Sequence, residues 1–346
     1  MKNHSNLDIL RALAVSLVVG DHSLKMIFGI NEIAGVNINR IGILGVLFFF
    51  VHTCLVLMYS LERQDGGGPV RLSAHFVVRR FFRIYPLSIF VLTVILLFHI
   101  PSSHIAGVGV VADYHASVAE VIANLFLVQN VFFDNHILGV LWSLPWEVQM
   151  YLTLPLLYLV FGKSRRWLLL LALWPVCVLL SHRIFLMSYV PCFLPGVIAY
   201  ALGGRVHRRI PGALWPVFIA LLVVAYCVMP DKRFDPAVCL ALGCGIPFFR
   251  EVNFRPIALV AHQVATYSYG IYLGHLFCLW LCFSKVGGLS LPVRIAAYPC
   301  ILLAVTVCMY RFIEKPFISL GTRVADRLTG VSGAGHVRAV LSRERA

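Results

Sequence analysis

Long apolar runs alternate along this chain with short segments that contain charged residues, proline or glycine. Most runs approach the ~20 residues that an α-helix needs to cross a bilayer, and the segments between them are typical of connections between such helices. We expect membrane spans near residues 7–27, 41–61, 84–100, 143–162, 167–182, 186–202, 212–229, 236–249, 267–285 and 291–313.

The apolar stretch 118–133 differs from these runs because it is interrupted by Glu120, Asn124, Gln129 and Asn130. So many polar side chains are costly in a helix that is exposed to lipid. We predict an interfacial or re-entrant helix here and not an eleventh span. The predicted fold class is all-α, a polytopic transmembrane helix bundle of about ten spans.

The distribution of Lys and Arg orients the predicted bundle. With the N-terminus in the cytoplasm, ten spans leave 22 of the 29 Lys and Arg residues on the cytoplasmic side, as the positive-inside rule requires. The basic residues on the other side are Lys25, Arg40, Arg183, Lys232, Arg233, Lys285 and Arg294. An eleventh span would move the basic segment 163–166 to the outside, against the rule. We therefore expect both termini to be cytoplasmic.

Composition agrees with a membrane protein. The 346 residues are 60% hydrophobic and only 13% charged, whereas a soluble domain has about 25% charged residues. The net charge of +14 does not indicate a nucleic-acid partner, because the basic residues lie in clusters between apolar runs. The ten cysteines lie mostly within apolar runs, where we expect small buried side chains and no metal site.

The chain divides into two parts on the same evidence. We expect residues 1–320 to form one membrane-integral domain and residues 321–346 to form a basic, partly disordered cytoplasmic tail. The first apolar run lacks a cleavage site of small residues, so we expect it to remain as a span.

Arg11 and His22 lie eleven residues apart in the first apolar run. Eleven residues make about three helical turns, so the two side chains share a face, roughly 16 Å apart along the axis. Such groups inside a membrane helix usually face a polar cavity and mark a reaction or transport path. Asp8 is three residues before Arg11 and is expected to pair with it. The alternative is that Arg11 anchors the helix at the cytoplasmic headgroups and His22 caps its outer end near Asp21.

Arginines gather before the third predicted span, in the sequence VVRRFFRIYPL at residues 77–87. Arg83 shares a helix face with both Arg79 and Arg80. A guanidinium group binds phosphate through two parallel hydrogen bonds, so this cluster is suited to hold a polyphosphate. The alternative is a juxtamembrane anchor for anionic lipids.

Glu147 enters an apolar run within WSLPWEVQMY at residues 142–151. A carboxylate inside the membrane needs a partner or a cavity, and we expect Glu147 to pair with Arg11 or to orient His22. The aromatic residues around it are also typical of an interfacial belt.

Two later segments place polar groups in the last two spans. TYSYGIYLGH, at residues 266–275, carries Ser268, Tyr272 and His275, which are either polar packing groups or part of a cavity. YRFIEKPF, at residues 310–317, is expected to form a structural salt-bridge lock at the cytoplasmic face and not to supply a catalytic group.

These motifs, in this order, resemble the acyltransferase 3 family of integral membrane acyltransferases, from Leu7 to about Leu320. The resemblance is carried by Leu-Asp-x-Leu-Arg with a His eleven residues after the Arg, by Arg-Arg-x-x-Arg-x-Tyr-Pro, and by Trp-Ser-Leu-x-x-Glu. Enzymes of this family acylate hydroxyl groups of cell-surface polysaccharides, lipopolysaccharide, nodulation factors, peptidoglycan and some antibiotics.

One motif departs from the family. Its second span usually reads Phe-Phe-x-x-Ser-Gly, whereas this chain has FFFVHTC. Thr53 keeps the hydroxyl group, and Cys54 loses the close backbone approach that glycine allows. His52, beside them, is either a packing residue or an added polar group in the cavity.

The resemblance implies that an acyl group, most often acetyl, passes from acyl-CoA to a hydroxyl of a sugar or lipid-linked surface glycan. Arg80 and Arg83, with Arg79 beside them, would hold the CoA phosphates. Arg11 would position the thioester or stabilise its oxyanion. His22 would take the proton of the acceptor hydroxyl, or carry the acyl group itself.

The same resemblance implies a role for Glu147, which would orient His22 or balance its charge. We expect no permanently bound cofactor. The expected partners are acyl-CoA, the glycan acceptor and membrane lipids, and the expected location is a bacterial inner membrane. The competing hypothesis is a secondary transporter or flippase with an intramembrane proton relay, although the sequence shows no inverted repeat.

Overall fold

The computed structural model of the protein describes residues 5–33, 35–98, 104–105, 109–110, 116–133, 136–162, 166–206, 209–229, 231–286 and 288–330. Its longer helices are α1 (Ser5–Phe28), α2 (Asn39–Gln64), α3 (Pro69–Leu97), α6 (Leu144–Leu157), α7 (Trp167–Ser181), α8 (Val190–Gly203), α9 (Trp215–Val228), α10 (Asp235–Gly245), α11 (Arg255–Trp280), α12 (Leu291–Met309) and α13 (Lys315–Thr329). The described chain is therefore almost entirely helical, which confirms the all-α fold class.

Short elements connect these helices. They are α4 (Val118–Leu125), α5 (Gln129–Phe132), the 3-10 turns η1 (Gly139–Ser143), η3 (Phe185–Met187), η4 (Gly212–Leu214), η5 (Lys232–Phe234) and η6 (Ile246–Phe248), and the π-helical turns η2 (Tyr158–Gly162), η7 (Leu281–Lys285) and η8 (Tyr310–Glu314). Strands β1 (Glu32–Ile33) and β2 (Val36–Asn37) form one antiparallel hairpin, and β3 (His104–Ile105) and β4 (Gly109–Val110) form another.

Within the described residues, four helical segments are long and apolar enough to cross a membrane: Asn39–Gln64, Pro69–Leu97, Phe185–Gly203 and Leu291–Thr329. All ten predicted ranges fall on helices, but the count of ten spans and the orientation of the termini stay predictions. Helix α1 is not among the four because its 24 residues include Asp8, Arg11, Asp21 and Lys25.

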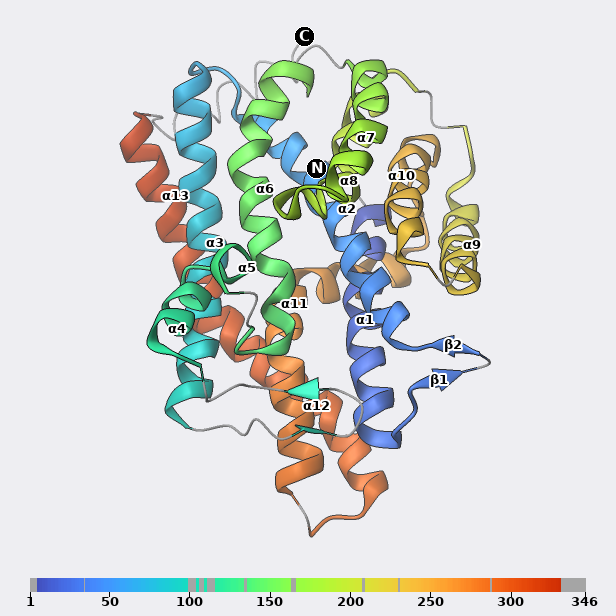
Figure 1. Cartoon of the computed structure of the whole chain (residues 1–346), viewed down its shortest axis with the longest axis vertical. Coiled ribbons are helices and arrows are strands. Elements are labelled where there is room, and N and C mark those ends of the chain that lie inside the picture. Colours follow the sequence, from blue (N-terminus) through green and yellow to red (C-terminus); the bar gives the residue numbers. More distant parts are fainter. Residues whose placement is uncertain are drawn as a thin grey trace.

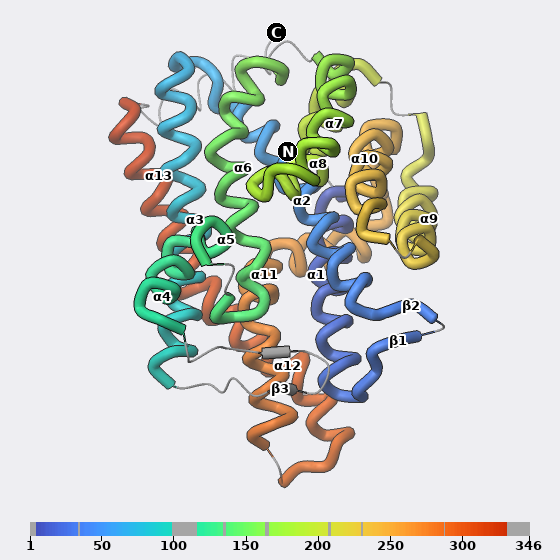
Figure 2. The backbone as a smooth tube through the Cα atoms, in the orientation of Figure 1, coloured from blue at the N-terminus to red at the C-terminus, as the bar shows by residue number. Residues whose placement is uncertain are grey.

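The bundle is organised around α1 and α2. Helix α1 packs against α2 and α11, and α2 also packs against α8, which in turn contacts α7 and α10. Helix α13 lies alongside α3 on the other side of the molecule (Figures 1 and 2). This arrangement brings residues of α1, α2, α3, α6 and α11 to one region in the middle of the bundle.

A glycine on the facing helix compensates for Cys54. The side chain of Cys54 is fully buried, and a Cβ atom added to Gly196 of α8 would lie only 2.7 Å from the Cβ of Cys54. The close approach of α2 and α8 is therefore provided by Gly196, because the absence of a side chain on one of the two helices is sufficient.

The stretch 118–133 forms the two short helices α4 and α5, and neither is long enough to span a bilayer. Its polar residues have protein partners. Ser117 and Glu120 form a capping box at the start of α4, and the side-chain oxygen of Asn124 accepts a hydrogen bond from the backbone N–H of Ile137. These local bonds explain why the apolar stretch stops short of a span.

The last helix crosses the predicted boundary between membrane domain and tail. Helix α13 continues to Thr329, with Gly321 packed against Phe82 and Ala325 fully buried. The boundary predicted after residue 320 thus falls inside a helix. The rest of the predicted tail, 331–346, and most of the basic segment, 163–165, lie outside the described residues.

The predicted orientation can be tested by cysteine labelling. Ala74 in α3 and Ser290 before α12 are both exposed and lie on opposite sides of the predicted membrane. In a background with the exposed Cys300 and Cys308 replaced by alanine, an impermeant thiol reagent should label Ser290→Cys in intact cells and Ala74→Cys only after the membrane is opened. The reverse pattern would invert the topology.

Candidate active site

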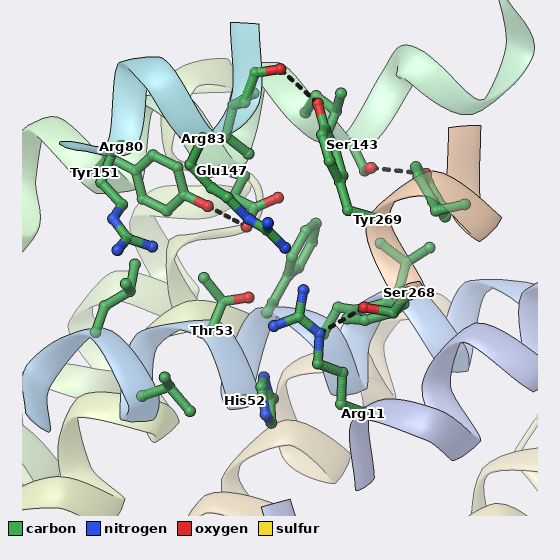
Figure 3. A pocket seen from close by; sticks show the side chains of 18 residues that line it. Arg11, His52, Thr53, Arg80, Arg83, Ser143, Glu147, Tyr151, Ser268 and Tyr269 are labelled. Atoms are coloured by element: carbon green, nitrogen blue, oxygen red, sulfur yellow. Dashed lines mark hydrogen bonds between the residues drawn. The ribbon is translucent and has the colours of Figure 1, made fainter. Parts of the chain in front are cut away.

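A cavity of about 90 Å³ lies where α1, α2, α3, α6 and α11 meet. Among its described lining residues, three arginines (Arg11, Arg80 and Arg83) stand against a single carboxylate, Glu147. Figure 3 shows the guanidinium groups of Arg11 and Arg83 near Glu147, and that of Arg80 beside Tyr151. His52 and Thr53 of α2 also line this cavity.

Arg11 is held by helix α11. Its Nε donates a hydrogen bond of 2.6 Å to the Oγ of Ser268, which donates in turn to the carbonyl oxygen of Ala265. The expected pairing of Arg11 with Asp8 is not formed. The Asp8 carboxylate lies 2.9 Å from the Nδ1 of His262 instead, because Asp8 lies at the rim, where α11 offers a closer partner.

Arg83 is balanced by a carboxylate from the far end of the sequence. Its Nη1 lies 2.8 Å from the Oε2 of Glu314, whose side chain is completely buried in the π-helical turn η8. The segment 310–317 therefore does form a salt bridge, as predicted. Its partner is an arginine of α3 that also lines the cavity, so the pair links the last helices to the site.

Arg80 is compensated much less. It lies in the cavity wall with its guanidinium 5.7 Å from the centroid of the Phe76 ring. Its buried Nε has no hydrogen-bond partner among the described residues. A buried cation that is only partly satisfied favours the binding of an anion. Arg79, the third arginine of this cluster, lines neither this cavity nor the one beside it.

Glu147 faces the arginines and not His22. The hydroxyl of Tyr151, one turn later in α6, donates a short hydrogen bond to its Oε1. The positive charges of Arg11 and Arg80 act on the same carboxylate. Among the described residues no ion pair joins Glu147 to Arg11, so both expectations for Glu147, pairing with Arg11 and orienting His22, stay predictions.

A second, wider cavity of about 370 Å³ adjoins the first. The two share Arg11, His52, Val56 and Arg83 as lining residues. The second cavity adds polar and aromatic side chains from α1, α2, α11 and η8: Asp8, Tyr59, Arg63, Thr266 and Tyr310. In the predicted orientation it opens toward the cytoplasm.

Arg63 is a charged residue of this second cavity that the sequence motifs did not indicate. A signal was present, because His52, Val56, Tyr59 and Arg63 follow one another at intervals of four, three and four residues along α2. Such spacing places all four on one helix face. Once His52 faces the cavity, Arg63 is expected at its mouth.

His22 and His275 form a pair outside these cavities. The Nδ1 of His22 lies 2.9 Å from the Nε2 of His275, with ring centroids 5.0 Å apart. Both Arg11 and His22 thus contact α11, which confirms that they share a face of α1. Tyr272 lines the first cavity and lies one turn before His275, with the two ring centroids 6.2 Å apart.

With this geometry in place, the comparison with known proteins can be interpreted. A family model described as an acyltransferase domain matches residues 4–313, nearly the whole chain. The chain belongs to the acyltransferase 3 family. No curated protein and no solved structure matches it. Because the chain belongs to this family, the protein is an acyltransferase. The family and the apolar helices together support a location in a membrane.

Of the site residues expected for this acyltransferase, Arg79 lines neither cavity, and the other nine divide into two groups. Seven of them lie around the two adjoining cavities: Asp8, Arg11, His52, Thr53, Arg80, Arg83 and Glu147. His22 and His275 contact each other outside the cavities, and His275 lies one turn after Tyr272, which lines the first cavity. The residues that close the wall of the first cavity, Ser268 and Tyr272, were noted in the sequence as polar groups of a span, with no specific partner.

The Arg83–Glu314 pair generates a stability prediction. Arg83→Met leaves the buried Glu314 carboxylate uncompensated, so the purified protein should lose about 3–5 kcal/mol of stability, the usual result of removing one partner of a buried pair. Arg83→Met with Glu314→Gln should recover most of the melting temperature, because no charge is then left unpaired.

Thermal unfolding in detergent measures both variants. Arg183→Met serves as the control, since Arg183 is exposed. A double variant no more stable than Arg83→Met would show that the pair is not what stabilises this region.

Proposed function

We propose that this acyltransferase moves an acyl group, typically acetyl, from acyl-CoA to a hydroxyl of a surface glycan or lipid-linked sugar in a bacterial inner membrane. The observation that carries the proposal is the excess of arginine over carboxylate in the first cavity. A buried positive site of this kind suits a donor that carries several phosphate groups. O-acetylation of a polysaccharide or of lipopolysaccharide is the reaction that fits best.

The donor would bind with its phosphates where the two cavities join, between Arg63 and Arg80, and with its thin pantetheine arm extending into the narrower cavity. Arg63 and Arg83 line the wider cavity, and Arg80 lines the narrower one. Arg83 is already engaged by Glu314, so Arg63 and Arg80 are the guanidinium groups best able to form new contacts with phosphate. Glu147 keeps the net charge of the site moderate, and this permits release of the product CoA.

The acyl end of the donor would lie beyond Tyr272. The hydroxyl of Tyr272 donates to the carbonyl of Val140 at 2.7 Å and accepts from the hydroxyl of Ser143 at 2.8 Å. This arrangement holds the ring between the cavity and the histidine pair. Movement of the Tyr272 ring would give the thioester access to His22.

The transfer itself needs a base and a stabiliser of negative charge. The acceptor oxygen attacks the thioester carbonyl carbon while His22 takes the hydroxyl proton. The carbon–sulfur bond then breaks, and the same proton passes to the CoA thiolate, so the protein returns to its starting state. The positive charge that His22 gains on taking the proton is the one nearest the oxyanion, whereas Arg11, roughly 16 Å away along α1, would orient the arm of the donor.

The experiment that tests this function is mass analysis of surface glycans from cells with and without the gene, joined to an assay of the purified protein with acetyl-CoA. An acyl mass that disappears with the gene, and transfer or slow hydrolysis of acetyl-CoA in vitro, would support the proposal. A transporter or flippase would consume no acetyl-CoA, and that result would favour the competing hypothesis.

Replacement of His22 tests the base. His22→Ala removes a small, partly exposed side chain, so the protein should insert and purify normally. The rate of transfer should fall at least ~10²-fold, the lower range for loss of a general base. Binding of acetyl-CoA should persist, because the arginines lie elsewhere. A variant that folds, binds donor and acylates at the wild-type rate would overturn the mechanism.

Replacement of single arginines tests the donor site. Arg63→Ala and Arg80→Ala should each raise the KM for acetyl-CoA about tenfold or more, since a charge-assisted hydrogen bond contributes ~1.5–3 kcal/mol. The KM for the acceptor should change little. Arg183→Ala, the exposed control, should leave both constants unchanged. An unaltered donor KM in both cavity variants would mean that these arginines bind lipid headgroups and not the donor.

A further inference from the structure

The contact between His22 and His275 indicates which of their ring nitrogens carry a hydrogen. Two imidazole nitrogens 2.9 Å apart must share a single hydrogen, because two N–H groups would repel each other and two lone pairs would form no bond. The direction of this hydrogen bond follows from the other contacts of His275.

His275 is held in one tautomer by backbone carbonyls. Its Nδ1 lies 2.8 Å from the carbonyl oxygen of Tyr272 and 3.1 Å from that of Ile271. A carbonyl oxygen only accepts, so the Nδ1 of His275 carries a hydrogen. In the neutral ring the Nε2 of His275 then has the lone pair, and it accepts from the Nδ1–H of His22. His275 is completely buried, so water does not compete for this arrangement.

The other nitrogen of His22 is thereby left with a lone pair. Its Nε2 lies 3.8 Å from the Oδ2 of Asp21, beyond hydrogen-bond distance. Asp21 is engaged elsewhere, since its Oδ1 lies 2.6 Å from the Nζ of Lys25. About a fifth of the His22 side chain is exposed (21%), whereas Asp21 and Lys25 are almost wholly buried. The Nε2 of His22 is therefore unprotonated, and the side chain that carries it is partly exposed.

We propose that His275 is a positioning residue that holds neutral His22 as the Nδ1–H tautomer, so that Nε2 is the nitrogen that reacts. The tautomer assignment stands on the hydrogen bonds alone. The statement that Nε2 reacts rests on the proposed function of His22. A neighbour that fixes the tautomer and the ring orientation of a functional histidine acts as do the outer partners of histidines in other sites.

The arrangement also defines the proton balance of the transfer. When Nε2 takes the hydroxyl proton of the acceptor, His22 becomes an imidazolium with both nitrogens protonated. Its Nδ1–H still donates to His275, so the hydrogen bond is kept and strengthened by the charge. When Nε2 gives that proton to the CoA thiolate, the starting tautomer returns without rearrangement. No other proton has to move.

The tautomer can be read directly by nitrogen NMR of the intact protein in lipid. The chain has 13 histidines, so the His22 signals are identified as those lost in His22→Gln. The expected spectrum of neutral His22 shows a protonated Nδ1 and an unprotonated Nε2. In His275→Leu the share of this tautomer should fall, since the bond to the Nε2 of residue 275 is lost and only the backbone carbonyl of Val18 still acts on the His22 ring. A neutral His22 protonated at Nε2 in the wild type would overturn the proposal.

Two substitutions at position 275 separate positioning from packing. His275→Gln places an amide oxygen near the former Nε2, where it accepts from His22, whereas His275→Leu fills the space without an acceptor. His275→Leu should lower kcat by about 10–100-fold, the usual cost of losing such a partner, with the KM for acetyl-CoA unchanged. His275→Gln should restore most of the rate. His182→Leu, at an exposed position, is the control.

The outcomes distinguish this proposal from the function on which it rests. Equal activity of His275→Leu and the wild type, or an His275→Gln variant as slow as His275→Leu, would overturn the positioning role. The expected tautomer in a protein that transfers no acyl group would support the assignment of the hydrogen bond and overturn the catalytic role of Nε2.

Discussion

The structure depends on the compensation of guanidinium groups inside an apolar helix bundle. A charge in such surroundings is costly unless a counter-charge or hydrogen-bond partner accompanies it. Arg83 is matched by the buried carboxylate of Glu314, and Arg11 by the hydroxyl of Ser268. Each contact joins helices that are distant in sequence: α3 to η8, and α1 to α11. The same contacts therefore hold the bundle together and fix the walls of the cavity.

The positive charge of Arg80 is incompletely compensated, and the proposed function depends on this. Arg80 has an aromatic ring beside it and Glu147 across the cavity, but among the described residues no carboxylate bonds to it directly. An anionic ligand can supply the missing charge, whereas a fully neutralised site would have no such affinity. Helix α1 connects this positive region with His22, and α11 runs parallel to the same path through Tyr272. The proposed function thus uses two separate levels of the same pair of helices, one for donor binding and one for proton transfer.

Most helices were predictable because long apolar runs occur where a helix is buried or exposed to lipid. Every predicted span overlaps a helix, and the polar residues of 118–133 correctly indicated that this stretch forms no long helix. The continuation of α13 past residue 320 was not predictable. The continuation depends on packing against α3, where Gly321 accommodates Phe82. The surface of a neighbouring helix cannot be inferred from the local pattern of apolar and polar residues. The close approach of α2 and α8, which Gly196 permits beside Cys54, was not predictable for the same reason.

The sequence by itself determined which polar side chains enter the bundle and which of them share a helix face. Helical periodicity is local, so the shared face of Arg11 and His22 followed from their spacing alone. Only the tertiary structure decided their partners. It gave Arg11 to Ser268 and His22 to His275. Partner choice depends on the rotation and depth at which α11 packs against α1, and these are set by contacts over the whole bundle.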